Sequence, residues 1–278
     1  MLSVIIPHRG RERHLAICLW AIVRSAWEAP GVSLEVLVVE AGPWPPGVEV
    51  VGPIAFRTIL DPEHGRVFNK PRLLNLGIEG AGGDVIAFLD ADAIVGKDWA
   101  ASTQRLLGTY PPTKLCYRVK QVRDHWIDAI EEANWRERED LIDWFFWRWD
   151  EWNTAFEAYG EAHVGFHRGR LPGGKVFGNS QFAIRRDVLG DMRFDERYEG
   201  GGFEDIEFNR RLGWLPGYQA EMVTEPASAM IHLYHPRTYV KGDAWADPEM
   251  VQANERRYFS LEEYEGCQTF PSMVSNIS

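Results

Sequence analysis

Two aspartates separated by one residue, Asp90 and Asp92, end a short apolar run that begins after Gly82 and Gly83. The run has the composition of a buried strand. In an open α/β sheet, ligands bind beyond the carboxyl ends of the strands. Paired carboxylates at such an end suit a hard divalent cation and the phosphate oxygens that it bridges. An isolated Asp-x-Asp is also compatible with a simple acidic turn, so the other motifs of the chain must decide.

A second pair of acids, Glu204 and Asp205, follows the glycines at 200–202 and precedes an apolar helical stripe. Acids at a helix start also offset the helix dipole, which is the structural alternative for this pair. A carboxylate that faces an acceptor hydroxyl acts as a general base, and glycines let a ligand approach the backbone closely.

Two histidines, His232 and His235, follow the strand-like run 227–231. Imidazole is a good ligand for Mn²⁺, although a lone histidine is more often structural. Residues three apart on a strand lie on opposite faces, so we expect at most one of the two to act at any one site.

The elements that would position these residues alternate along the first part of the chain. Apolar patterning predicts strands at 2–7, 34–39, 56–60 and 84–95, with helices at 13–27 and 69–79. This order is typical of a nucleotide-binding α/β sheet. Further helices are expected at 98–107 and 248–259, and further strands at 115–119 and 173–186.

The composition limits the possible functions. A chain of 278 residues accommodates one large α/β domain. A net charge of −11 argues against a nonspecific nucleic-acid binder. No apolar run is long enough to predict a signal peptide or a membrane span, and the 3 cysteines are widely spaced, as in reduced cytoplasmic proteins.

Four ordered motifs make the chain resemble a glycosyltransferase of the GT-A fold, similar to the inverting family 2 enzymes. The motifs are 3–7 (SVIIP), 37–42 (LVVEAG), 75–78 (NLGI) and 83–92 (GDVIAFLDAD). Residues 201–212 resemble a galactosyltransferase-type C-terminal region, with a glycine-rich loop, Glu-Asp, and then Asn209, Arg211 and Leu212. Together the resemblance covers roughly 2–96 and 173–236. The chain departs from it at Glu40-Ala41, where two aspartates are usual, and in a glycine loop without tryptophan.

The resemblance implies a role for each matching position. Asp205 would be the general base, while Glu204, Gly201 and Gly202 would hold the acceptor. The nucleotide would contact Pro7, Glu40 and Asp90, and Mn²⁺ or Mg²⁺ would be held by Asp90, Asp92 and one histidine, with His232 favoured over His235. Beside the resemblance, Arg9, Arg11 and Lys70 are candidate nucleotide contacts that would neutralise phosphate charge as the nucleoside diphosphate leaves, and the alternative for each is a solvated surface group.

Half of the 12 tryptophans lie between residues 124 and 159, a segment without glycine or proline. Its helical spacing favours amphipathic helices packed on the sheet. Alternatively, rings such as Trp149 and Trp152 form a platform for an acceptor sugar, or an exposed apolar patch makes a dimer or membrane-surface contact.

These patterns predict an α/β protein with a GT-A, Rossmann-like mixed sheet, helices on both faces and a Trp-rich helical insertion. Within one domain we expect a nucleotide-sugar-binding half at 1–115, the insertion at 116–172, and an acceptor-binding, catalytic half at 173–278. The predicted function is metal-dependent, inverting hexosyl transfer from a nucleotide-diphosphate sugar, with UDP favoured, to a saccharide or glycoconjugate. The sequence does not indicate an oligomeric state.

Two other classes remain open at this stage. A nucleotidyltransferase would carry a Gly-rich, Lys/Arg-containing loop after the first strand, which the segment 8–11 (HRGR) matches poorly. A carbohydrate-binding protein on a degenerate transferase fold would use the aromatic residues as its surface, but it would have no use for a general base.

Overall fold

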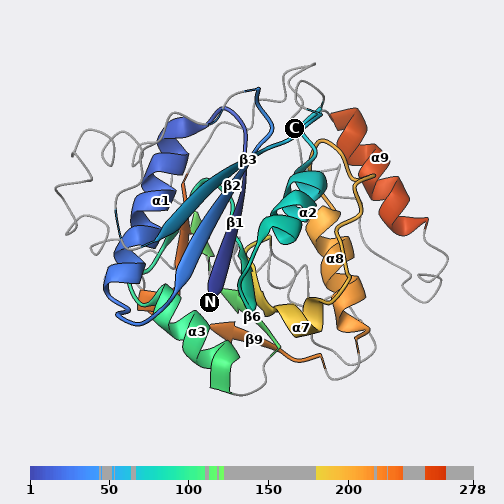
Figure 1. The fold of residues 1–278 in the computed structure, drawn as a ribbon. Helices are drawn as coiled ribbons and strands as arrows, with labels where there is room; N and C mark the ends of the chain where they lie inside the picture. Colours follow the sequence, from blue (N-terminus) through green and yellow to red (C-terminus); the bar gives the residue numbers. More distant parts are fainter. Residues whose placement is uncertain are drawn as a thin grey trace.

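The computed structural model describes residues 1–43, 45, 52, 54–63, 67–109, 113–117, 119–121, 180–215, 218–223, 225–233 and 248–260. Within these residues a seven-stranded sheet has the order β3-β2-β1-β4-β8-β6-β9 (Figure 1). The strands of this sheet are β1 (Leu2–His8), β2 (Leu34–Glu40), β3 (Ala55–Leu60), β4 (Val85–Phe88), β6 (Lys114–Tyr117), β8 (Phe182–Arg185) and β9 (Ala220–Val223).

Strand pairing makes the sheet mixed. Strand β1 lies parallel to both β2 and β4, whereas β8 runs antiparallel to its neighbours β4 and β6. The register sets Ile5 against Phe88 and His8 against Glu40, so β1, β2 and β4 end at the same edge. The loops that carry the predicted site residues therefore leave the sheet side by side.

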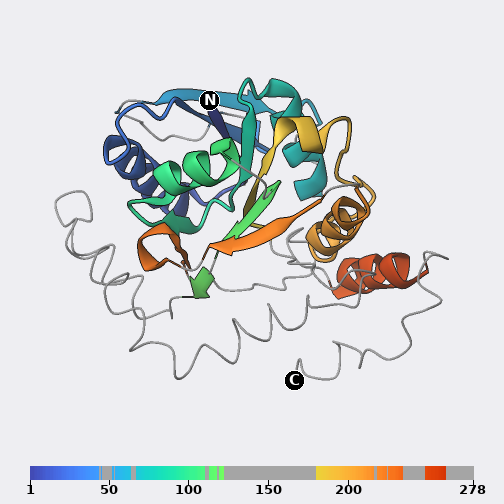
Figure 2. The ribbon, with the colours of Figure 1, turned by 90° about the horizontal axis from the view of Figure 1, so that it is seen from below.

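Helices cover both faces of the sheet, as Figure 2 shows. Helices α1 (Glu12–Trp27) and α3 (Trp99–Thr109) share one apolar cluster with the first face. Helices α2 (Lys70–Gly80), α7 (Arg186–Leu189) and α8 (Glu204–Gly213) contribute to a second cluster on the opposite face. Helix α9 (Pro248–Phe259) lies beside α8 and joins it through a small aromatic cluster.

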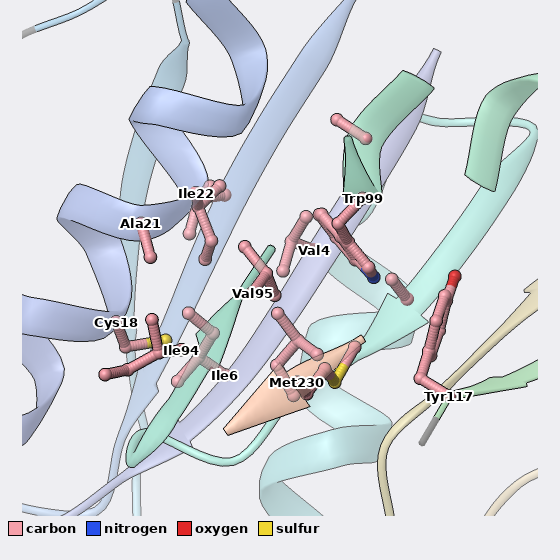
Figure 3. Close-up of a cluster of buried hydrophobic side chains, with 14 of the residues drawn as sticks. Val4, Ile6, Cys18, Ala21, Ile22, Ile94, Val95, Trp99, Tyr117 and Met230 are labelled. Carbon is pink, nitrogen blue, oxygen red and sulfur yellow. The ribbon is translucent and has the colours of Figure 1, made fainter. Parts of the chain in front are cut away.

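A second, three-stranded sheet has the order β5-β10-β7 and consists of β5 (Ala93–Val95), β7 (Val119–Gln121) and β10 (Met230–His232). It packs into the α1 side of the core. Figure 3 shows side chains of α1, β1, β5, β10 and α3 pointing toward one another, with Trp99 of α3 and Met230 of β10 among them. Both side chains are fully buried.

The single strand predicted at 84–95 is wrong in one respect, because the structure divides it into β4 and β5. The polar residues Asp90 and Asp92 cannot continue a fully buried strand, and a turn at 91–92 redirects the chain to the second sheet. The strand predicted at 115–119 is likewise divided between β6 and β7.

Most of the other predicted elements are present. The strands at 2–7, 34–39 and 56–60 and the helices at 13–27, 69–79, 98–107 and 248–259 are confirmed within a few residues. The strand predicted at 173–186 is present as β8 near its end, and residues 173–179 lie outside the described part of the chain. The strand-like run at 227–231 is a strand only at its end, because Pro226–Ser228 form a 3₁₀ helix and β10 begins at Met230. The helices favoured between 124 and 159 lie outside the described residues.

We expect Gly77→Ala to destabilise the fold, although alanine is the better helix former. A Cβ at position 77 of α2 would lie 2.3 Å from Cγ2 of the fully buried Ile5 on β1. Such overpacking costs roughly 1–3 kcal/mol of the free energy of unfolding. Gly108→Ala in α3 is the matched control, because nothing lies within 4 Å of its added Cβ. Urea unfolding should show a loss for the first variant and no loss for the second; equal effects would contradict the close packing of α2 on β1.

Candidate active site

The site lies where β1 and β4 end. A pocket enclosing about 310 Å³, part of it open solvent, is lined by Pro7, His8, Arg9, Arg11, Phe68, Lys70, Asp90, Ala91 and Asp92. Five of the predicted nucleotide contacts and both aspartates of the Asp-x-Asp motif thus line one pocket. Parallel register explains this convergence, since it sets the loops after β1 and β4 beside each other.

Lys70, at the start of α2, is the central cation of the site. Its Nζ lies 2.5 Å from Oδ1 of Asp90 and 3.7 Å from Oε1 of Glu204. Burial alone lowers the pKa of Lys70, but the two carboxylates outweigh it and hold that pKa above its ordinary value. The ammonium therefore stays charged and links the Asp-x-Asp segment to the Glu-Asp pair.

Asp90 receives hydrogen bonds in addition to this ion pair. Ser180 Oγ donates to Asp90 Oδ2 at 2.7 Å, and Gln181 Nε2 donates to the same oxygen at 3.4 Å. Burial raises the pKa of Asp90, but Lys70 and Ser180 overcome this and hold the pKa below its ordinary value. Asp90 is thus an ionised carboxylate fixed by three side chains.

Asp92 is held from two directions. Arg11 Nη1 donates to Oδ2 at 3.0 Å, and His232 Nε2 lies 3.3 Å from Oδ1. The antiparallel pairing of β10 with β5 sets His232 opposite Ala93, which explains why a residue so distant in sequence reaches the motif. A carboxylate and an imidazole side by side are both groups that can ligate a divalent cation.

Glu40 is engaged within the protein. Its Oε2 lies 2.5 Å from His8 Nδ1, and its Oε1 accepts a 2.6 Å hydrogen bond from the backbone N–H of Gly42. His8 Nε2 in turn accepts from the backbone N–H of Arg11 at 3.2 Å. The imidazole therefore fixes the loop from which Arg11 reaches Asp92. A contact between Glu40 and the nucleoside stays a prediction, and the observed role of Glu40 is to orient His8.

The glycine loop before α8 has an uncommon backbone. Gly200, Gly201, Gly202 and Phe203 have φ of 68°, 85°, 87° and 70°. Side chains rarely adopt this left-handed region, which explains the three glycines. The loop turns the chain so that α8 begins at Glu204, close to Lys70.

Glu204 and Asp205 differ in environment. Glu204 is buried, and among the described residues its Oε2 has no hydrogen-bond partner. Burial, with Asp205 beside it, raises the pKa of Glu204 to about 7 despite the opposing charge of Lys70. Asp205 is partly exposed, and its Oδ1 accepts from the backbone N–H of Ile206 at 2.8 Å.

The described residues form only part of a metal-binding site. Among the described residues, no three His, Cys, Asp or Glu side chains are arranged to hold a metal ion. Asp92 and His232 fit as two adjacent ligands, whereas Asp90 faces Lys70. Diphosphate oxygens would have to supply further ligands. His235, Trp149 and Trp152 lie outside the described residues, as does most of the predicted insertion at 116–172.

Several site residues were missed by sequence reasoning. Ser180 and Gln181 contact Asp90, Phe68 lines the pocket, and His8 joins Glu40 to the Arg11 loop. The sequence offered one indication for Ser180 and Gln181, because both directly precede the strand at 182–185. This strand, β8, pairs with β4, which leads to Asp90. No local pattern marks the pairing of His8 with Glu40.

Comparison with known proteins identifies the class. The profile of the glycosyl transferase family 2 matches residues 3–163, more than half of the chain. The chain therefore belongs to glycosyl transferase family 2. This confirms the family resemblance of the N-terminal half, while the galactosyltransferase-type C-terminal region stays a prediction. No curated protein matches the chain in sequence.

Solved structures share the fold at low identity. TarS 1–349 of S. aureus in complex with UDP has a TM-score of 0.57 and 13% identity, covering 95% of this chain and 73% of that one. The same TarS fragment with UDP-GlcNAc has a TM-score of 0.55 and 14% identity, covering 95% and 74%. The mannosyltransferase PcManGT from Pyrobaculum calidifontis, in complex with GDP-Man and Mn²⁺, has a TM-score of 0.50 and 19% identity, covering 86% and 58%. The predicted GT-A mixed sheet is thereby confirmed.

Among the helices that the structure describes, none is long and apolar enough to cross a membrane.

Glu204→Gln should change how stability depends on pH. The pKa of Glu204 rises from 4.5 to about 7 on folding, so between these values the folded chain keeps a proton that the unfolded chain releases. Ionisable Glu204 therefore lowers the free energy of unfolding as pH rises through this window, by up to roughly 3 kcal/mol. Glutamine does not titrate, and the variant should gain stability over the wild type from pH 4.5 to 7.

Urea unfolding of metal-free and nucleotide-free protein at several pH values measures this difference. Glu199→Gln, at an exposed position in the same segment, is the matched control for the loss of one negative charge. A constant difference between Glu204→Gln and wild type across the window would contradict the burial of an ionisable carboxyl at this position.

Proposed function

We propose that the protein is a metal-dependent, inverting hexosyltransferase that moves a sugar from a nucleotide-diphosphate sugar to a hydroxyl of a saccharide or glycoconjugate. The observation that carries the proposal is the Lys70 ammonium, which joins Asp90 of the donor side to Glu204 beside Asp205. This contact puts candidate groups for the leaving diphosphate and for the attacking hydroxyl at one edge of the sheet.

The donor side is built to accept a diphosphate. Arg9, Arg11 and Lys70 bring positive charge to the pocket that holds Asp90 and Asp92. Mn²⁺ or Mg²⁺ held by Asp92, His232 and Asp90 would stabilise negative charge on the departing nucleoside diphosphate. Asp90 would exchange its Lys70 contact when donor and metal bind, and Lys70 would then neutralise phosphate. Pro7 and the β1 loop would contact the nucleoside.

UDP is the favoured nucleotide. The support is the higher structural similarity to TarS 1–349, whose structures contain UDP and UDP-GlcNAc, than to the mannosyltransferase with GDP-Man. A GDP-sugar is the second candidate, because the mannosyltransferase with GDP-Man shares the fold at a lower TM-score.

The acceptor side supplies the proton chemistry. In direct displacement, the acceptor oxygen forms a bond to the anomeric carbon while the bond from that carbon to the phosphate oxygen breaks, and Asp205 takes the hydroxyl proton. Oε2 of Glu204, which is buried and has no hydrogen-bond partner within the described part of the chain, would bind an acceptor hydroxyl. Gly201 and Gly202 let the sugar approach the backbone, because neither carries a side chain. A single displacement inverts the anomeric configuration.

Asp205→Asn should abolish transfer while leaving nucleotide binding intact. Removal of a general base typically costs about 10²–10⁴-fold in turnover. The measurement is the rate of nucleoside-diphosphate release with an acceptor present, together with calorimetric titration of the nucleotide. Asp187→Asn, at an exposed position on α7, is the control and should retain full turnover. Undiminished turnover in Asp205→Asn would remove Asp205 from the mechanism.

Metal and nucleotide should bind together. In calorimetric titrations of UDP, GDP and their common sugar conjugates, we expect one nucleotide to bind tightly only when Mn²⁺ or Mg²⁺ is present. Asp92→Asn should remove this dependence because it eliminates the ligand that His232 and Arg11 orient. Absence of nucleotide binding with every metal would favour the carbohydrate-binding alternative.

A further inference from the structure

The backbone from Gly200 to Phe203 needs support from outside the loop. All four residues have positive φ, between 68° and 87°, and Phe203 carries a side chain in this region. Glycine adopts such φ values freely but leaves the loop with many alternative conformations, whereas at Phe203 the conformation persists only where the surrounding structure enforces it. The loop leads directly into Glu204 and Asp205, so whatever fixes it also fixes where these carboxylates lie.

One side chain on α9 contacts three carbonyl groups of this loop. Asn254 Nδ2 donates to the backbone oxygens of Glu199, Gly201 and Gly202 at 2.8, 3.1 and 3.3 Å. Asn254 is 3% exposed, so these contacts are shielded from water. The three contacts hold the carbonyls of Glu199, Gly201 and Gly202 around one amide group, and they therefore favour the observed conformation of the loop.

The rest of α9 packs on the same loop. A Cβ at Gly200 would lie 2.9 Å from Sδ of Met250, which leaves room for glycine alone unless Met250 shifts. The Tyr258 ring lies with its centroid 5.6 Å from that of Phe203, in a cluster that also contains Tyr198. Both views of the fold show α9 alongside α8 (Figures 1 and 2).

The loop is tied to the pocket on its other side. The backbone N–H of Gly200 donates to the carbonyl of Phe68 at 3.0 Å, and Phe68 lines the pocket with Lys70. The loop therefore spans from α9 to the donor side, with Glu204 and Asp205 at its end.

We propose that Asn254 is a positioning residue, which through its three carbonyl contacts holds the Gly200–Phe203 loop in the conformation that aims Asp205 at the acceptor. Helix α9 thereby helps to position the residues of the acceptor side. The inference rests on the proposed function for its catalytic consequence, whereas its structural part concerns the loop alone.

Asn254→Asp and Asn254→Ala test the inference. Aspartate keeps the size of the side chain but sets a carboxylate against three carbonyl oxygens, and alanine removes the donor. We expect kcat to fall by about 10²-fold because a displaced general base loses its alignment. Nucleotide affinity and donor KM should stay within about 2-fold of wild type, since the pocket residues are unchanged. Arg256→Ala, at an exposed position of the same helix, is the control and should change neither quantity.

Hydrogen exchange supplies a readout independent of activity. Amides of 200–206 should exchange about 10-fold faster in both Asn254 variants. The exchange rate is expressed relative to that of β1 amides, so that a general loss of stability is not mistaken for a local effect. If Asn254→Asp fails to fold, the Asn254→Ala variant alone tests the inference. Unchanged loop exchange, or kcat within about 2-fold of wild type, would overturn the inference. A wild type inactive with every donor would instead refute the proposed function, while the exchange result would still report the role of Asn254.

Discussion

The site depends on a buried ammonium between two carboxylates, of which Glu204 is buried and Asp90 is partly exposed. Lys70, Asp90 and Glu204 come from α2, from the loop after β4 and from the first residue of α8. Removing any one of these charged groups from water without a partner would lower the stability of the fold. The ion pairs offset this desolvation cost only while all three side chains are present and close together. The contact therefore joins the N-terminal sheet to the C-terminal helices. It also keeps the pocket at the ends of β1 and β4 at a fixed spacing from Glu204 and Asp205, the acids that we propose act on the acceptor.

A second chain of contacts extends from this centre along the edge of the sheet. Glu40 orients His8, His8 holds the Arg11 backbone, and the Arg11 side chain reaches Asp92, which His232 approaches from the other side. The links connect the ends of β1, β2 and β10 to the turn after β4. Because polar groups in such a network support one another, the loss of one member should disturb the next. The geometry of Asp92, which we propose as a metal ligand, is thus set partly at the end of β2.

What the sequence predicted well was local. Apolar runs of the right length predicted β1 and β2, and the Asp-x-Asp spacing predicted a pair of acids at the strand end where the pocket lies. Both patterns are contained in short segments of the sequence. The contacts of Ser180 with Asp90, of His8 with Glu40 and of Asn254 with the glycine loop join distant segments, and no spacing rule encodes them. The prediction of one strand at 84–95 failed for the opposite reason. The apolar residues before and after the two aspartates form one continuous pattern in the sequence. In the structure, those before the aspartates form β4 of the seven-stranded sheet, and those after them form β5 of the three-stranded sheet.

The antiparallel pairing of β10 with β5 has a consequence for the order in which the protein assembles. Strand β5 follows the Asp-x-Asp turn directly, but its partner comes from close to the other end of the described chain. Closing so large a loop carries an entropic cost before its contacts form. The parallel β1-β2-β4 unit joins nearer segments, so its pairing closes shorter loops. The contact between Asp92 and His232 depends on a longer loop than that unit does, and we expect it to form later in folding.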